Sequence, residues 1–282
     1  MLPERDECIE QTYFFRTFRE RLAEQVPAQE ILARMPEELL TTTRLPMAVE
    51  FLATEMKHTG LLASGMKRLA HYFTAFQAFV ARQAEEDGVK FSIQTALTVL
   101  EREASYKAEK PTPQGLFVFQ FETISRNRLG YDEGLFACEK EPMYDAAWRN
   151  FCDLVRRQVG VYEFSDLLYA RSEQYSIDER RKKPDFVPSV PPLFASQEGR
   201  IAKASHGRDP MFLFAALQRQ LNYPEVPRTK PRDDTARKIE ALEMRLREME
   251  SRMRMTESEL RGNFDPTQFG KPDMFRDVKD DV

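Results

Sequence analysis

The sequence has few cysteines and few glycines. Its three cysteines, Cys8, Cys138 and Cys152, are an odd number and show no CxxC spacing. We therefore expect reduced thiols in a cytosol-like compartment and no zinc site built on cysteine. Glycine occupies only 11 of 282 positions, against about 7% of residues in average proteins. This scarcity disfavours a β architecture with many tight turns.

Long apolar runs are also missing. No stretch approaches the ~18 consecutive apolar residues that a membrane-spanning helix needs. The first ten residues, MLPERDECIE, mix both charge signs and lack the apolar core of a secretion signal. These absences predict a cytoplasmic protein that does not use a membrane.

The chain shows no strong excess of either charge. The formal net charge is −4, and 31% of residues are charged, which describes an ordinary solvated surface. Nucleic acid is therefore not expected as the main partner. The GxSxG, Walker and GxGxxG patterns do not occur. The sequence accordingly predicts no catalytic residue, no metal ligand and no cofactor.

What the chain does contain favours helices. Hydrophobic residues make up 41% of the sequence, with 21 phenylalanines, which is enough for a sizeable core. Apolar residues recur at helical spacing over most of the chain. We predict an all-α fold, in which a multi-helical globular domain carries a Pro-rich extended arm and a C-terminal coiled-coil helix. The expected segments are a helical globular domain at 1–175, a Pro-rich basic arm at 176–208, an amphipathic helix at 209–223, a linker at 224–232, a coiled-coil helix at 233–262 and an acidic flexible tail at 263–282.

Several local signals give more detailed expectations. Residues 61–86 carry one wide apolar stripe and are expected to form a single long helix. Residues 130–142 contain two glycines and a proline and are expected to form a loop. The segment PTPQGLFVFQFETI could alternate as a strand, but Thr112-Pro113 is a typical helix start and favours a helix. Ser92 and Asp209 are expected to cap two further helices.

The stretch 238–260, KIEALEMRLREMESRMRMTESEL, has a heptad pattern. Its apolar positions are spaced 3, 4, 3, 4, 3, 4, as in a coiled-coil seam. In a parallel dimer each basic g position would face an acidic e position of the other copy, whereas antiparallel pairing would oppose like charges. We therefore predict a parallel homodimer. The alternative is a helix that folds back on its own domain or stays solvated. The residues expected to carry self-association are Ile239, Leu242, Leu246, Met249, Met253 and Leu260 in the seam, with Arg245 and Glu250 as a g–e pair.

Two further groups could carry chemistry but have simpler interpretations. Glu55 and His58 form an ExxH pair on one helix face, but di-iron bundles need a second such pair, which is absent. The acidic segment with Asp132, Glu133, Glu139 and Glu141 could pair carboxylates for acid–base work, although solvated surface acids are the commoner outcome.

The basic run Arg180, Arg181, Lys182 and Lys183 could contact an anion or nucleic acid. No aromatic stacking platform accompanies it in the sequence, and basic residues in an exposed segment usually serve solubility.

Three functions remain open at this point. The heptad pattern favours a non-enzymatic scaffold or adaptor that forms a homodimer and holds a protein partner. An enzyme or small-ligand binder whose site is assembled from distant helices is the second. An RNA-associated factor that uses the basic run is the third.

Overall fold

The computed structural model describes residues 4–86, 90–229 and 235–260, and in 235–241, 255 and 258–260 it describes only the backbone. Over these residues the chain forms helices and no strand, so the predicted all-α class is confirmed. The helices are α1 (Arg5–Ala23), α2 (Ala28–Arg34), the 3-10 turn η1 (Met35–Glu37), α3 (Leu45–Thr59), α4 (Leu62–Arg68), α5 (Ala75–Glu86), α6 (Ile93–Ala108), α7 (Pro113–Asn127), α8 (Tyr131–Glu139), α9 (Ala146–Gln158), α10 (Phe164–Ala170), α11 (Glu173–Lys182), α12 (Ser196–Ala204), α13 (Pro210–Leu221) and α14 (Thr235–Leu260).

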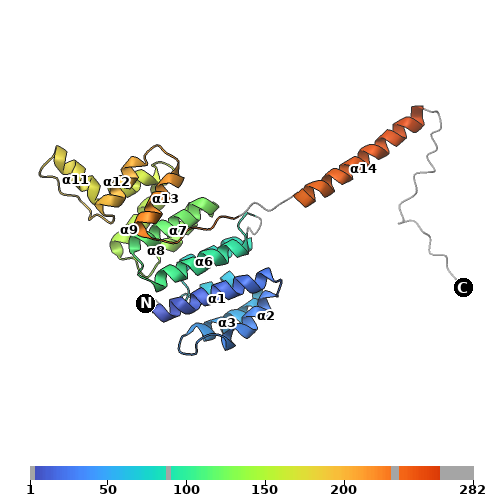
Figure 1. Ribbon diagram of the computed structural model, residues 1–282, viewed down its shortest axis with the longest axis horizontal. Helices are drawn as coiled ribbons and strands as arrows, with labels where there is room; N and C mark the ends of the chain where they lie inside the picture. Colours follow the sequence, from blue (N-terminus) through green and yellow to red (C-terminus); the bar gives the residue numbers. More distant parts are fainter. Residues whose placement is uncertain (1–3, 87–89, 230–234, 261–282) are drawn as a thin grey trace. The chain divides into compact units, whose positions relative to one another are not determined.

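The chain divides into two compact units, Met1–Lys230 and Pro231–Val282. In the first unit α1 packs along α6, with α2 and α3 on one side of this pair and α7 on the other (Figure 1). The helices α8–α13 follow α7 in the chain and pack against it or against one another. None of the described helices combines the length and apolar character needed to cross a bilayer.

Aromatic packing forms much of the core where α7, α9 and α10 meet. The Phe121 and Phe164 rings stack with centroids 3.8 Å apart. Phe117 contacts Trp148 and Phe151 at centroid distances of 5.6 and 5.2 Å. Aromatic pairs of this kind add about 0.5–1.5 kcal/mol beyond the area that they bury. The phenylalanines of the sequence are thus used mainly to join helices.

The predicted helix starts are confirmed. Ser92 accepts a hydrogen bond from the backbone N–H of Thr95, and Thr112 accepts one from Gly115. Asp209 likewise accepts from the N–H of Met211. The segment after Thr112 is the helix α7, so the strand alternative is wrong. Every residue from Gly115 to Ile124 is buried, which explains why apolar residues on all faces of this helix made a strand conceivable.

The single helix expected at 61–86 is wrong, because the chain breaks into α4 and α5. The hydroxyl of Thr74 accepts from the Gln77 N–H at 3.2 Å, and the Gln77 amide oxygen accepts from the Thr74 N–H at 3.0 Å. This reciprocal pair is a capping box and starts a new helix at Ala75. The break produces the turn between α4 and α5.

The loop expected at 130–142 is mostly the helix α8. Gly130, with φ 89°, precedes its first residue. Gly134 lies inside α8, where an added Cβ would come within 2.6 Å of the Ile124 side chain. The second glycine therefore permits close packing of α8 on α7 and does not mark a turn.

The segment 176–208 is not an extended arm throughout. It contains the end of α11 and all of α12, and it lacks a helix at 183–195 and at 205–208. The first of these parts is anchored, since Leu193 donates its N–H to Arg171 O at 2.8 Å and Glu173 donates its N–H to Phe194 O at 2.9 Å. The Phe194 ring is buried against Trp148 and Phe151.

The first part of the expected linker, 224–229, is bound to the domain. Val226 is buried, and the Asn127 side chain donates to Pro227 O at 3.1 Å. The Tyr223 hydroxyl donates to Glu122 Oε2 at 2.7 Å. Residues up to Thr229 therefore belong to the helical domain and not to a free linker. The predicted tail 263–282 lies outside the described residues.

Candidate functional site

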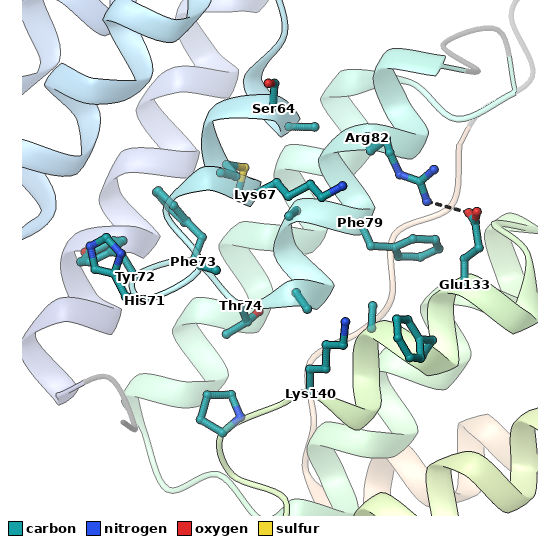
Figure 2. A pocket seen from close by; sticks show the side chains of 18 of the residues that line it. Ser64, Lys67, His71, Tyr72, Phe73, Thr74, Phe79, Arg82, Glu133 and Lys140 are labelled. Atoms are coloured by element: carbon teal, nitrogen blue, oxygen red, sulfur yellow. Dashed lines mark hydrogen bonds and ion pairs between the residues drawn. The ribbon is translucent and has the colours of Figure 1, made fainter.

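A cleft of about 1180 Å³ lies between α4, α5 and α8, inside the first unit (Figure 2). Its inner lining includes the buried side chains of Met66, Phe73 and Phe79. Phe136 on α8, 48% exposed, adds an aromatic wall. The turn that follows α4 and the first turn of α5 also line the cleft, so the capping box described above shapes it.

Most charged groups around the cleft are paired. Arg82 forms ion pairs with Glu133 at 2.6 Å and with Glu86 at 3.4 Å. Arg156 forms an ion pair with Asp132 at 3.1 Å. These pairs join α5 to α8 and α9 to α8, and they hold the walls of the cleft together.

Two carboxylates at the cleft accept hydrogen bonds from backbone N–H groups. Glu85 accepts from Leu62 and Ala63 and thereby caps the start of α4. Burial raises the pKa of Glu85, and these two hydrogen bonds partly oppose the shift. Glu7 accepts from the Arg44 N–H at 2.7 Å and from the Tyr72 hydroxyl at 2.6 Å. Both carboxylates therefore serve to hold neighbouring elements in place.

Two lysines at the cleft are not paired with acids. Within the described part of the chain, Lys67 and Lys140 have no carboxylate at ion-pair distance. Lys140 Nζ lies 3.9 Å from the centroid of the Phe136 ring, a cation–π contact. Figure 2 shows Lys67, from α4, and Lys140, from the end of α8, reaching toward the same space beside Phe79.

A second group of charges is fully buried between α6, α7 and the end of α8. Lys107 Nζ lies 3.2 Å from Glu103 Oε1 and 3.0 Å from Glu141 Oε1. Gln120 donates to Glu103 at 2.9 Å, and the Tyr144 hydroxyl donates to Gln120 Oε1 at 2.9 Å. The second oxygen of Glu103 has no hydrogen-bond partner. We call Glu103, Lys107, Glu141, Gln120 and Tyr144 the buried charge cluster.

The buried charge cluster holds one more carboxylate than ammonium. Burial raises the pKa of Glu103, and Lys107 opposes this only in part. Burial would by itself lower the pKa of Lys107, but Glu103 and Glu141 together raise it. Lys107 therefore stays charged.

The ExxH pair is not a metal site in this fold. Glu55 is buried and forms an ion pair with Arg68, which satisfies its charge. Nor does the fold gather the four acids of 132–141. Asp132 and Glu133 lie at the cleft, whereas Glu141 belongs to the buried charge cluster. The interpretation as solvated surface acids is thus wrong for Glu141.

Glu163, Asp166 and His206 come together although the sequence separates them. His206 Nδ1 lies 2.8 Å from Asp166 Oδ1. Glu163 accepts from the Gly207 N–H at 2.9 Å and from the Ser165 hydroxyl at 3.1 Å. These bonds tie the turn after α12 to the start of α10, and they account for the arrangement without an ion.

The basic run is largely engaged at the end of α11. Arg180 donates to Phe186 O at 3.2 Å, Arg181 lies 3.7 Å from Asp178, and Lys182 lies 2.6 Å from Glu179. Basic residues in a last helical turn also interact favourably with the helix dipole. Contact of this run with an anion stays a prediction.

The C-terminal helix α14 presents the described part of the heptad seam to solvent. Leu242, Leu246, Met249 and Met253 are 60, 54, 52 and 64% exposed. The side chains of Ile239 and Leu260 lie outside the described residues. Arg245 and Glu250 are exposed, and Arg252 pairs with Glu248 at 2.6 Å along the helix. Helix formation here agrees with the sequence, and pairing of two copies stays a prediction.

The three cysteines are buried and free, as the sequence suggested. Burial raises the pKa of Cys8 to about 11 and that of Cys152 to about 12. Burial also raises the pKa of Cys138. Thiols of this kind are poor nucleophiles at neutral pH.

Sequence reasoning missed the cleft and the buried charge cluster. Lys67 and Arg82 come from the consecutive helices α4 and α5, whereas Lys140 follows α8 much later in the chain, and the three show no shared motif. The Thr74-x-x-Gln77 capping signal could have revealed the helix break behind the cleft. Comparisons with protein-family models, with curated proteins and with solved structures found no match for this chain.

Proposed function

We propose that the protein is a non-enzymatic helical scaffold that forms a homodimer through a parallel coiled coil of α14 and holds a protein partner. The observation that carries this proposal is the exposed seam. Leu246, Met249 and Met253 are each more than half exposed on one continuous helix. Apolar side chains spaced in heptads are typical of a helix that pairs with another.

The second copy is the occupant that the charges favour. In a parallel pair Lys238 would face Glu243, Arg245 would face Glu250, and the next basic g position would face the next acidic e position. Each exposed pair contributes only ~0.2–1 kcal/mol, but antiparallel pairing would turn all of these contacts repulsive. The charge pattern therefore selects the orientation.

The association is expected to be weak. The seam extends over about three heptads, its d positions include Met249 and Thr256, and neither gives the dense packing of leucine. Dimers should form in a concentration-dependent manner and dissociate on dilution.

Sedimentation velocity of the full chain over a wide concentration range tests the proposal. The double variant Leu246→Asp/Met253→Asp places charges in the seam and should abolish dimers. The matched control is Met244→Asp, since Met244 is 66% exposed on the same helix but lies outside the seam. It should dimerise as the natural chain does. A natural chain that stays monomeric at all concentrations, or equal effects of seam and control variants, would refute self-association through α14.

A further inference from the structure

The cleft between α4, α5 and α8 has the composition of a ligand site. Pockets for small molecules measure about 300–1,000 Å³ and are mainly apolar, with a few polar groups at fixed positions. At about 1180 Å³ this cleft is slightly larger than that range. Met66, Phe73 and Phe79 supply its apolar inner lining, and Phe136 supplies an exposed ring at its edge.

The charges at the cleft favour an anion. The carboxylates of Glu86, Asp132 and Glu133 are ion-paired, and those of Glu7 and Glu85 accept backbone hydrogen bonds. Among the described lining residues, Glu4 is the only acid without such an ion pair or hydrogen bond, and it lies at the start of α1.

The cations differ. Of the lining groups that the structure describes, the ammonium groups of Lys67 and Lys140 are not neutralised by an acid. They come from two different elements, and Figure 2 shows both extending toward the space beside the Phe79 ring. The amino-terminal end of α5, at Thr74 and Ala75, also lines the cleft. A helix start carries a partial positive charge, which adds to that of the lysines.

We propose that this cleft binds a small amphipathic anion, in which a carboxylate or phosphate is attached to an apolar chain or ring. The anionic group contacts Lys67 and Lys140, and the apolar part lies against Phe79 and Phe136. The proposal does not depend on pairing of α14, because every group that it uses belongs to the unit Met1–Lys230.

Isothermal titration calorimetry of the full chain tests this with three probes that share one chain length: decanoate, decyl phosphate and decanol, each below its aggregation concentration. At least one anion should bind, and its affinity should fall as salt is added. The neutral alcohol should bind at least about tenfold more weakly, as expected when a charge-assisted hydrogen bond is lost. Comparison of the two anions decides between a carboxylate and a phosphate ligand.

Three variants locate the site. Lys67→Gln and Lys140→Gln should each weaken binding of the anion by about tenfold, the loss of one charge-assisted contact. Both side chains are exposed, so folding should be unaffected, which circular dichroism checks. The control is Lys57→Gln, an exposed lysine on α3 outside the lining, which should bind as the natural chain does.

The proposal is overturned if neither anion binds, if decanol binds as tightly as the anions, or if Lys57→Gln weakens binding as much as the cleft variants do. A fourth variant, Phe136→Ser, separates the apolar contribution. It should weaken both anions without changing their salt dependence, and unchanged affinity would contradict the assigned position of the apolar part.

Discussion

Replacing Lys107 by methionine should destabilise the helical domain severely. The Lys107 side chain is only 5% exposed, and its Nζ lies 3.2 Å from Glu103 and 3.0 Å from Glu141. Methionine has nearly the same length, so the variant removes the charge without opening a large cavity. It leaves two carboxylates, 0 and 1% exposed, without their cation.

The expected loss of unfolding free energy is about 3–5 kcal/mol, the range found when one partner of a buried ion pair is removed. Natural domains have only about 5–15 kcal/mol in total, so the effect should be easy to measure. The loss should be smaller in mild acid, because protonation of Glu103 removes one of the two uncompensated charges.

Urea denaturation followed by tryptophan fluorescence measures this effect. The single tryptophan, Trp148, is buried and lies 5.6 Å from the Tyr144 ring of the buried charge cluster. The control is Lys110→Met at an exposed position just after α6, which should change stability by less than about 0.5 kcal/mol. The triple variant Lys107→Met/Glu103→Gln/Glu141→Gln should recover much of the loss, since replacing a whole buried ion pair is often close to neutral. Equal stability of the Lys107 and Lys110 variants would refute the reasoning.

Three further predictions concern single buried groups. Burial raises the pKa of Glu103 above its ordinary value of 4.5, so its stabilising protonated form is present at low pH and is lost as pH rises through the raised pKa. Glu103→Gln should therefore become more stable relative to the natural chain as the pH of urea titrations rises above 4.5, and a difference that does not change with pH would count against this. Tyr223→Phe removes a 2.7 Å hydrogen bond to the Glu122 carboxylate and should cost about 1.5–3 kcal/mol in the same assay; an unchanged midpoint would mean that the segment after α13 is not anchored there. The three buried cysteines should resist iodoacetamide in the native protein even at pH 9 and react after denaturation, as mass spectrometry would show, and rapid native labelling of Cys152 would contradict its raised pKa of about 12.

Local signals in the sequence predicted the starts of helices well and the continuity of helices less well. The caps at Ser92, Thr112 and Asp209 depend on two or three neighbouring residues, and each was predicted correctly. The apolar stripe over 61–86 hid the break at Thr74, because both α4 and α5 bury the same kind of side chain. Gly134 indicated a turn by composition, whereas its lack of a side chain serves close helix packing.

Neither the cleft nor the buried charge cluster could be predicted, because tertiary packing creates both. Lys107 looks like any surface lysine of an amphipathic helix until Glu141 arrives from the end of α8. Lys67 and Lys140 acquire a common environment only when α4, α5 and α8 meet. The heptad pattern of α14, in contrast, can be found in the sequence because one continuous segment carries it, and its pairing stays a prediction.

Disulfide cross-linking of a Leu242→Cys chain tests the central claim, parallel pairing through α14, most directly. In a parallel dimer the two copies of this seam position face each other. In an antiparallel dimer centred on the seam they would lie about 20 Å apart, because each copy is about seven residues from the middle of the seam and a helix rises 1.5 Å per residue. The native cysteines are buried, so they should not interfere. Mild oxidation should give a covalent dimer from Leu242→Cys and little from Met244→Cys, which lies outside the seam. No dimer from Leu242→Cys, or equal yields from the two variants, would contradict the account.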